Sequence, residues 1–291
     1  MVDATDIAIP GIDGALAEAL AKIEIPPRPA VLDQVMAEMK SDEPDFRRLA
    51  SLIMSDVGLS AVLIKTANAP IFGYRTRVGT VREALTMLGL VMVLRTVAAY
   101  AARQALPETP SLKGFWDTSA RVAHLSGWLA RELGIQDGIR PQDAYTYGLF
   151  RDCGIPVLSK VRDGYDKVLA AATGDETRAF TEVESAQLTL NHAMVGSVMA
   201  RSWYLPDTLC DAILHHHDAA AISGNGDLSA AGRRLVALAQ LAEKLQGGGA
   251  PAIACEWNKL GPAVLDALEI GDNTLERLQA EAGEILKQLD S

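Results

Sequence analysis

The sequence predicts an all-α protein. Apolar residues recur at helical spacing along nearly all of its 291 residues, and no segment alternates apolar and polar residues between turn signals as a strand would. Aromatic residues make up only 5% of the chain while alanine is frequent, a composition that suits close helix–helix packing. We therefore expect a helical bundle with an N-terminal helical subdomain and a C-terminal helical extension.

Capping and breaking residues mark the ends of the first predicted helices. Asp13 can cap a helix within residues 1–21, and the proline-rich segment 25–29 must follow its end. Asp45 and Asp56 can cap two further helices, because a carboxylate accepts hydrogen bonds from the free amides of a first turn. An apolar stripe predicts one more helix before them: Leu32, Val35, Met36 and Met39.

The most apolar stretch spans residues 85–102 and follows a capping box at Thr80 and Glu83. Gly89 and Arg95 interrupt it, and it is shorter than the about 20 apolar residues that a membrane-spanning helix needs. We expect a buried core helix. The N-terminal residues 1–10 lack the basic region of a signal peptide, which favours a cytoplasmic protein.

The last part of the chain, residues 221–291, predicts a helical extension packed on the same domain. Three glycines at 247–249 break it, and residues 273–289 form an amphipathic pattern. We find no internal repeat.

The charge balance excludes some partner classes. The net charge is −10, from 37 acidic and 27 basic residues, so we expect neither nucleic acid nor an anionic membrane as a partner. The three cysteines, Cys153, Cys210 and Cys255, contain no CxxC pair, which fits a reducing compartment.

Histidines are the candidate functional residues, because the chain has only five. Three are consecutive at 215–217 and precede Asp218, and His192 precedes a predicted helix. The segment 151–154 (RDCG) lies between two apolar stretches. Imidazole nitrogen and carboxylate oxygen together suit iron, manganese or zinc.

Each of these residues also has a structural explanation. The histidines could be core or helix-end residues bonded to backbone carbonyls, and Asp152 could cap a turn. For Arg151 we expect a buried ion pair rather than a catalytic role.

Separated motifs along the chain resemble the HDOD domain, and the resemblance covers residues 22–220. In order they are 25–30 (IPPRPA), 63–68 (LIKTAN), 84–89 (ALTMLG), 115–116 (FW), 151–154 (RDCG), 192–196 (HAMVG), 203–206 (WYLP) and 215–218 (HHHD). The resemblance implies an all-helical fold similar to the HD and HD-GYP metal-dependent phosphohydrolases. It also implies a signalling module that has largely lost the catalytic metal centre.

The resemblance places departures at three positions of an active HD-type site. The early histidine falls on Thr118, the His–Asp pair reads Arg151–Asp152, and the lysine that follows the pair in HD-GYP enzymes aligns with Ile155. A ligand- or metal-binding remnant survives: Asp152, His192, and His216 or His217.

Arg151 argues against hydrolysis at this remnant. A dinuclear centre holds two cations close together so that a bridging water becomes hydroxide near neutral pH. A guanidinium is a permanent cation, so it can occupy the vacant cation position, pair with Asp152 and repel a divalent metal. We therefore expect no catalytic residue and no bound metal.

The loop at residues 72–77 (FGYRTR) is basic and aromatic on an acidic protein. Arg75 and Arg77 could contact phosphate groups or an acidic partner. The alternative is an ordinary solvated connection, which is what most such loops are.

These observations favour a non-catalytic bacterial-type signal-transduction module that binds signalling proteins, with a nucleotide second messenger as a further candidate ligand. The alternative is a metal-dependent phosphohydrolase or phosphodiesterase of nucleotides or cyclic dinucleotides. In that case Asp152, His192 and His216 or His217 would hold one divalent iron, manganese or zinc ion. A structural adaptor that acts by oligomerisation is a third possibility.

Overall fold

The computed structural model describes residues 18–20, 23, 25–72, 77–106, 109–135, 138–247 and 251–290. Every regular element in these ranges is a helix, which confirms the predicted all-α class. Of the helix predicted within residues 1–21, only 18–20 are described, and they are helical. The chain divides into two compact units, one formed by Pro26–Pro107 and the other by Glu108–Ser291 with residues that precede Pro26.

The first unit packs three shorter helices on one long helix. Buried leucine, isoleucine and valine side chains from the short helices fill its core, among them Leu32, Leu49 and Leu63. Its elements are α2 (Ala30–Met39), α3 (Phe46–Met54), α4 (Val57–Ala67), the 3₁₀ turn η2 (Pro70–Phe72) and α5 (Val81–Ala105).

The predicted caps of this unit are present. The Asp45 carboxylate accepts hydrogen bonds from the amides of Arg47 and Arg48 at the start of α3, and Asp56 accepts one from Leu59 in α4. Thr80 and Glu83 form the predicted capping box of α5. Local sequence therefore determines where these helices begin.

Helix α5 contains the apolar stretch predicted as a core helix. Gly89 has φ +69° and bends the helix, in a conformation that favours glycine. Among the described residues, α5 is the one helix long and apolar enough to cross a membrane, and 61% of its most apolar 18 residues are buried. Helices α3 and α4 are long and apolar enough to cross a membrane only if the two are counted as one span, and they are bent by 119° relative to each other.

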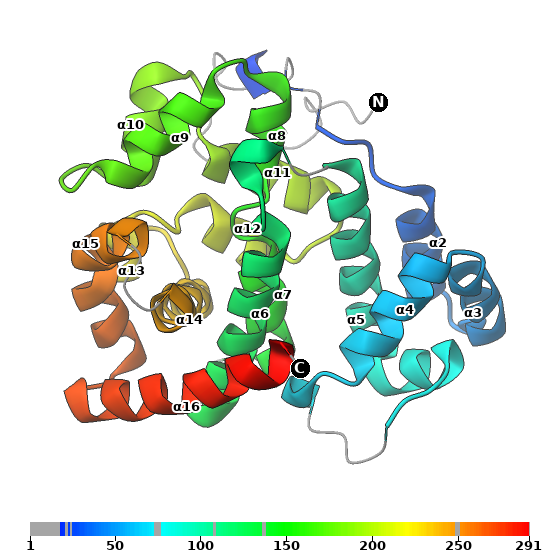
Figure 1. Ribbon diagram of the computed structural model, residues 1–291. Coiled ribbons are helices and arrows are strands. Elements are labelled where there is room, and N and C mark those ends of the chain that lie inside the picture. The colour runs from blue at the N-terminus through cyan, green and yellow to red at the C-terminus, as the bar shows by residue number, and fades with distance from the viewer. Residues whose placement is uncertain are drawn as a thin grey trace. The chain divides into compact units, whose positions relative to one another are not determined.

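The second unit contains the remaining elements, and Figure 1 shows α14 between α6 and α15. Helices α6 and α7 pack against each other and against α14, α8 packs on α11, and α9 packs on α10. The elements are η3 (Pro110–Leu112), α6 (Phe115–Glu132), α7 (Pro141–Phe150), α8 (Gly154–Val161), α9 (Tyr165–Gly174), α10 (Phe180–Gln187), α11 (His192–Ser202), α12 (Asp207–Leu214), α13 (Ala219–Ile222), α14 (Ala230–Gly247), α15 (Pro251–Leu268) and α16 (Asp272–Asp290).

Helices from residues 221–291 lie within this second unit rather than apart from it. Helix α14 is nearly all buried where it passes α6, α7 and α12, and Leu278 and Ala282 of α16 are buried as well. The division after Pro107 falls inside the segment 22–220 that the resemblance predicts as one domain.

Candidate functional site

Two glycines allow the site to form by letting α8 and α11 approach closely. A Cβ atom on Gly154 would lie 2.0 Å from the backbone oxygen of His192, and one on Gly196 would lie 3.2 Å from the amide nitrogen of Gly154. A Cβ at Gly154 would overlap the backbone of α11, and one at Gly196 would fit only if its neighbours shifted slightly. Their contact brings the turn that carries Asp152, between α7 and α8, against the start of α11, where His192 lies.

His192 is fixed by its cap and by a buried carboxylate. Asn191 caps α11 through the amide of Met194. The His192 Nδ1 atom lies 2.6 Å from Oε2 of Glu184, whose side chain is fully buried, and Tyr165 donates its hydroxyl proton to the other oxygen of Glu184. The ionised carboxylate holds the proton of His192 on Nδ1, so Nε2 is left to face the interior of the site.

His216 and His217 lie in the turn between α12 and α13, not on a helix. The Nδ1 atom of His216 donates to the carbonyl oxygen of Ile213 at 2.7 Å. The Nδ1 atom of His217 lies 2.5 Å from Oε1 of Glu256 in α15. Asp218, the fourth residue of this motif, caps α13 by accepting from the amides of Ala220 and Ala221.

Asp152, His192, His216 and His217 converge on one point, and we name these four residues the His–Asp cluster. Each offers one ligand atom, and the four atoms lie within 4.8 Å of one another. The Nε2 atom of His216 is 3.2 Å from Nε2 of His192 and 3.2 Å from Oδ1 of Asp152. The sequence left His216 and His217 as alternatives, and the structure brings both together.

The hydrogen-bond inventory of the His–Asp cluster requires a positive charge at its centre. Each imidazole uses Nδ1–H toward an oxygen acceptor, so a neutral ring presents only a lone pair on Nε2. Three such lone pairs and a carboxylate oxygen then face one another. At contacts of 3.2 Å this arrangement needs a shared proton or a bound cation.

The donor set of the His–Asp cluster fits one divalent cation. Three imidazole nitrogens and one carboxylate oxygen suit zinc, iron or manganese. The outer nitrogen of each ring donates to a carboxylate or a backbone carbonyl, the arrangement that orients metal-binding histidines. The absence of a metal, expected from Arg151, stays a prediction, and this geometry favours its alternative of a single divalent ion.

The electrostatics of the cluster agree with this inventory. Burial raises the pKa of the Asp152 carboxyl, but the Arg151 guanidinium and the hydrogen bond to His216 outweigh burial and hold that pKa well below its usual range. Burial lowers the pKa of His192, but Glu184 outweighs it and raises that pKa, so His192 can hold the shared proton.

The pair of His217 and Glu256 has a different charge state. Burial and the nearby His216 lower the pKa of His217 to about 3. Burial raises the pKa of Glu256, but the hydrogen bond to His217 and the ammonium group of Lys259 outweigh it and lower that pKa to about 2. Near neutral pH a neutral imidazole therefore donates to an ionised carboxylate.

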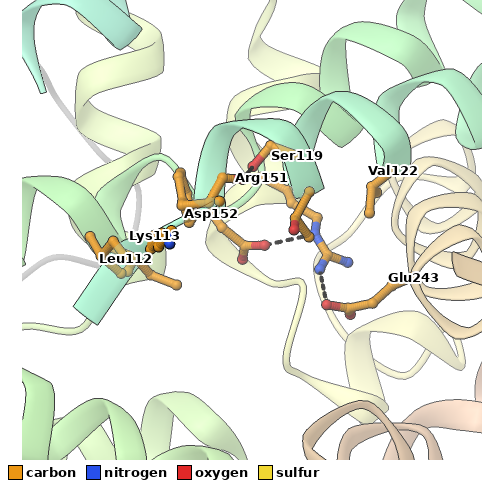
Figure 2. Close-up of a pocket in the computed structure, with 11 residues that line it drawn as sticks. Leu112, Lys113, Ser119, Val122, Arg151, Asp152 and Glu243 are labelled. Atoms are coloured by element: carbon orange, nitrogen blue, oxygen red, sulfur yellow. Dashed lines mark hydrogen bonds and ion pairs between the residues drawn. The ribbon is translucent and has the colours of Figure 1, made fainter. Parts of the chain in front are cut away.

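Arg151 forms the buried ion pair expected from the sequence, but with two carboxylates. Its Nε atom lies 2.8 Å from Oδ2 of Asp152, and its Nη2 atom lies 2.7 Å from Oε1 of Glu243 in α14. Figure 2 shows the guanidinium between the two carboxylates. Asp152 thus turns one oxygen toward Arg151 and the other toward the histidines.

A cavity of about 280 Å³ opens beside Arg151. Thr118, Arg151 and Ile155 all line it, so the three positions that the resemblance compares with an active HD-type site face one space. Lys113 and Glu243 also line the cavity and add one charge of each sign.

The remaining residues named from the sequence lie outside the His–Asp cluster, and one of them lies outside the described residues. Arg77 is exposed on the first unit, and Arg75 lies outside the described residues. Cys153 is fully buried, and burial raises the pKa of its thiol, so it is a core residue rather than a nucleophile.

Sequence reasoning missed the three supporting carboxylates, Glu184, Glu243 and Glu256. Glu184 belongs to none of the motifs, and the other two lie in the predicted C-terminal extension. No sequence signal distinguished them, because other polar residues, such as Lys244 and Lys259, lie beside Glu243 and Glu256 on the same helices.

Comparisons with known proteins place the chain among others of this architecture. The sequence model of the HDOD domain matches residues 25–219. An uncharacterized protein of Treponema pallidum (strain Nichols) is 25% identical over 201 residues, which is 67% of this chain and 38% of that protein. The chain therefore spans well under half the length of this relative.

Solved structures with this fold come from several bacteria. A candidate phosphohydrolase of Shewanella amazonensis SB2B has 19% identity and a TM-score of 0.66, with 94% of each chain covered. A candidate signal transduction protein of Marinobacter aquaeolei VT8 has 22% identity and a TM-score of 0.63, over 99% of this chain and 67% of that one. An HDOD domain protein of unknown function from Geobacter sulfurreducens has 22% identity and a TM-score of 0.54, over 90% and 93%. At these identities the likeness establishes the shared fold.

Proposed function

Because the chain belongs to the HDOD domain family, we propose that it is a non-catalytic signal-transduction module of bacterial type that acts in the cytoplasm. It binds a signalling protein, and the cavity beside Arg151 is the candidate site for a nucleotide second messenger. The observation that carries the proposal is the position of Arg151 between Asp152 and Glu243.

The argument is electrostatic. Two-metal hydrolysis needs two cations about 3.5–4 Å apart that share a bridging ligand. Here one oxygen of Asp152 faces the three histidines and the other is bound by a guanidinium that stays protonated at any physiological pH. The His–Asp cluster can accommodate one divalent ion, but the second positive charge is the guanidinium of Arg151, which cannot bind a water as a metal ion does.

A single ion in the cluster would then have a structural or regulatory role. His192, His216, His217 and Asp152 would hold it, and it would replace the shared proton that the cluster otherwise needs. Structural zinc sites usually have four protein donors, so these four residues would leave a bound zinc ion no position for a reacting water.

The second candidate function is a phosphohydrolase with a reduced site. The observation that favours it is the convergence of three imidazoles and a carboxylate within 4.8 Å beside an open cavity. It requires a coordination position that a substrate or a water can enter.

A turnover assay separates the two functions. The wild-type protein, loaded in turn with Mn²⁺, Fe²⁺ and Zn²⁺, is incubated with bis(p-nitrophenyl) phosphate and with cyclic dinucleotides, beside H192A and the control H215A, which changes a histidine outside the His–Asp cluster. We expect no turnover above that of H192A. Metal-dependent turnover by the wild type and H215A that is lost in H192A would establish the phosphohydrolase instead.

A further inference from the structure

Helices α14 and α15 lie outside the segment 25–219 that matches the HDOD domain, yet they contact the site at three points. Gln240 of α14 donates its side-chain amide to the carbonyl oxygen of His216. Glu243 of α14 pairs with Arg151, and Glu256 of α15 bonds to His217. The C-terminal helices therefore bond directly to the His–Asp cluster and to Arg151.

We propose that Glu256 is a positioning residue that orients His217 for a divalent cation in the His–Asp cluster. Cation binding is then coupled to the packing of α15 against the cluster, through the hydrogen bond between Glu256 and His217. This coupling rests on the proposed function and deepens it, because α15 is the helix that would transmit cation binding from the His–Asp cluster to the surface of the protein.

The position of Glu256 is well suited to this role. Its Oε1 atom lies 2.5 Å from Nδ1 of His217, and its Oε2 atom lies 2.8 Å from the ammonium group of Lys259. The carboxylate fixes both the orientation and the tautomer of His217, which leaves Nε2 as the ligand atom facing the cluster. Phe180 stacks on the ring of His217, with ring centroids 4.9 Å apart.

Helix α15 carries this contact to a second segment of the chain. Lys259 donates to the backbone oxygens of Asp175 and Arg178, and the thiol of Cys255 donates to that of Asp175. One turn of α15 thus contacts His217 through Glu256 and the loop between α9 and α10 through Cys255 and Lys259. Any displacement of this turn changes both contacts at once.

Thermodynamic reciprocity makes the coupling measurable from either end. If the packing of α15 against the cluster strengthens cation binding, then a bound cation must stabilise this packing of α15 by the same free energy. The cation affinity and the protection of α15 backbone amides from hydrogen exchange are therefore two independent readouts of one quantity.

The experiment compares wild type, E256Q and E256A with D266N, which changes an exposed acid on the same helix. Zn²⁺ affinity of the metal-free full chain is measured by competition with a chelating dye. We expect E256Q and E256A to bind Zn²⁺ roughly 10–100-fold more weakly than wild type, with E256A the weaker, and D266N to match wild type. E256Q retains an acceptor of the same shape, so it tests the charge if E256A fails to fold.

Hydrogen exchange supplies the second readout. Saturating Zn²⁺ is expected to slow exchange in α15 of the wild type and D266N, and to slow it less in E256Q. Failure of the wild type to bind one Zn²⁺, an E256Q affinity within twofold of wild type, or α15 exchange that does not respond to Zn²⁺ would each overturn the coupling. Turnover of a phosphodiester would overturn the proposed function and leave this coupling standing, so the two failures are distinct.

Discussion

At the scale of single residues, Arg151 places a guanidinium where the resemblance to HD-type sites predicts an imidazole, and this determines what the site can bind. An imidazole offers a lone pair to a metal, whereas a guanidinium offers only N–H donors and a fixed positive charge. Arg151 binds one oxygen of Asp152, which leaves the other oxygen to face the histidines.

Arg151 should be essential for stability because its removal leaves two carboxylates facing each other. We expect R151M to lose about 3–5 kcal/mol of unfolding free energy, the usual result of breaking a buried ion pair. The double variant R151M/E243Q should recover part of the loss. Urea denaturation followed by circular dichroism measures both, with exposed Arg162 as the matched control in R162A. A loss in R151M no larger than in R162A would contradict the proposed charge balance.

The residues of the His–Asp cluster were predictable from the sequence, but their supporting carboxylates were not. Asp152, His192, His216 and His217 belong to ordered motifs that resemble a known family, and the structure places them together. Glu184, Glu243 and Glu256 come from three helices whose facing sides are set by tertiary packing. One sequence without packing information does not show which acid on such a helix turns inward.

At the scale of helices, capping residues made the starts of α3, α4 and α5 predictable, because a cap acts within one turn of the chain. The turn at His215–His217 shows the limit of this approach. There α12 ends at Leu214, and the next helix begins only after its cap at Asp218.

The cap at Asp56 predicts an acid-sensitive first unit. The hydrogen bond from the Leu59 amide lowers the pKa of Asp56 below 3.8, its ordinary value, with help from the Tyr100 hydroxyl. A lowered folded-state pKa contributes stability that is present above the ordinary value and is lost as the pH falls through the folded-state value.

Urea denaturation at pH 7 and at pH 3 tests this effect. We expect D56N to lose less stability between the two values than the wild type, because asparagine caps without titrating. The exposed Glu43 supplies the control E43Q. Equal pH dependence in D56N and the wild type would show that this cap does not contribute to acid sensitivity.

The contact between α8 and α11 predicts that Gly154 is irreplaceable. A Cβ at this position would overlap the backbone of His192, so G154A must push the two helices apart. We expect a loss of about 1–3 kcal/mol in unfolding free energy, together with weaker Zn²⁺ binding, since Asp152 would move away from His192. G174A is the control because no atom lies within 4 Å of a Cβ built there. Wild-type Zn²⁺ affinity in G154A would show that this approach does not position the site.

At the scale of the whole molecule, the His–Asp cluster, Arg151 and the cavity all belong to the second unit. The all-α class was predictable because helical periodicity is a local signal that extends over most of the chain. The sequence also predicted an N-terminal helical subdomain, but it did not predict that the division into units falls inside the segment 22–220, since this depends on which helices pack together.

The number of divalent cations bound per chain tests the central claim most directly. Native mass spectrometry of wild-type protein, loaded with Mn²⁺ or Zn²⁺ and freed of excess metal, counts them. One cation held by the His–Asp cluster and lost in H192A is the predicted result, because the guanidinium of Arg151 holds the neighbouring position. Two cations bound together at Asp152 in the wild type would contradict the account.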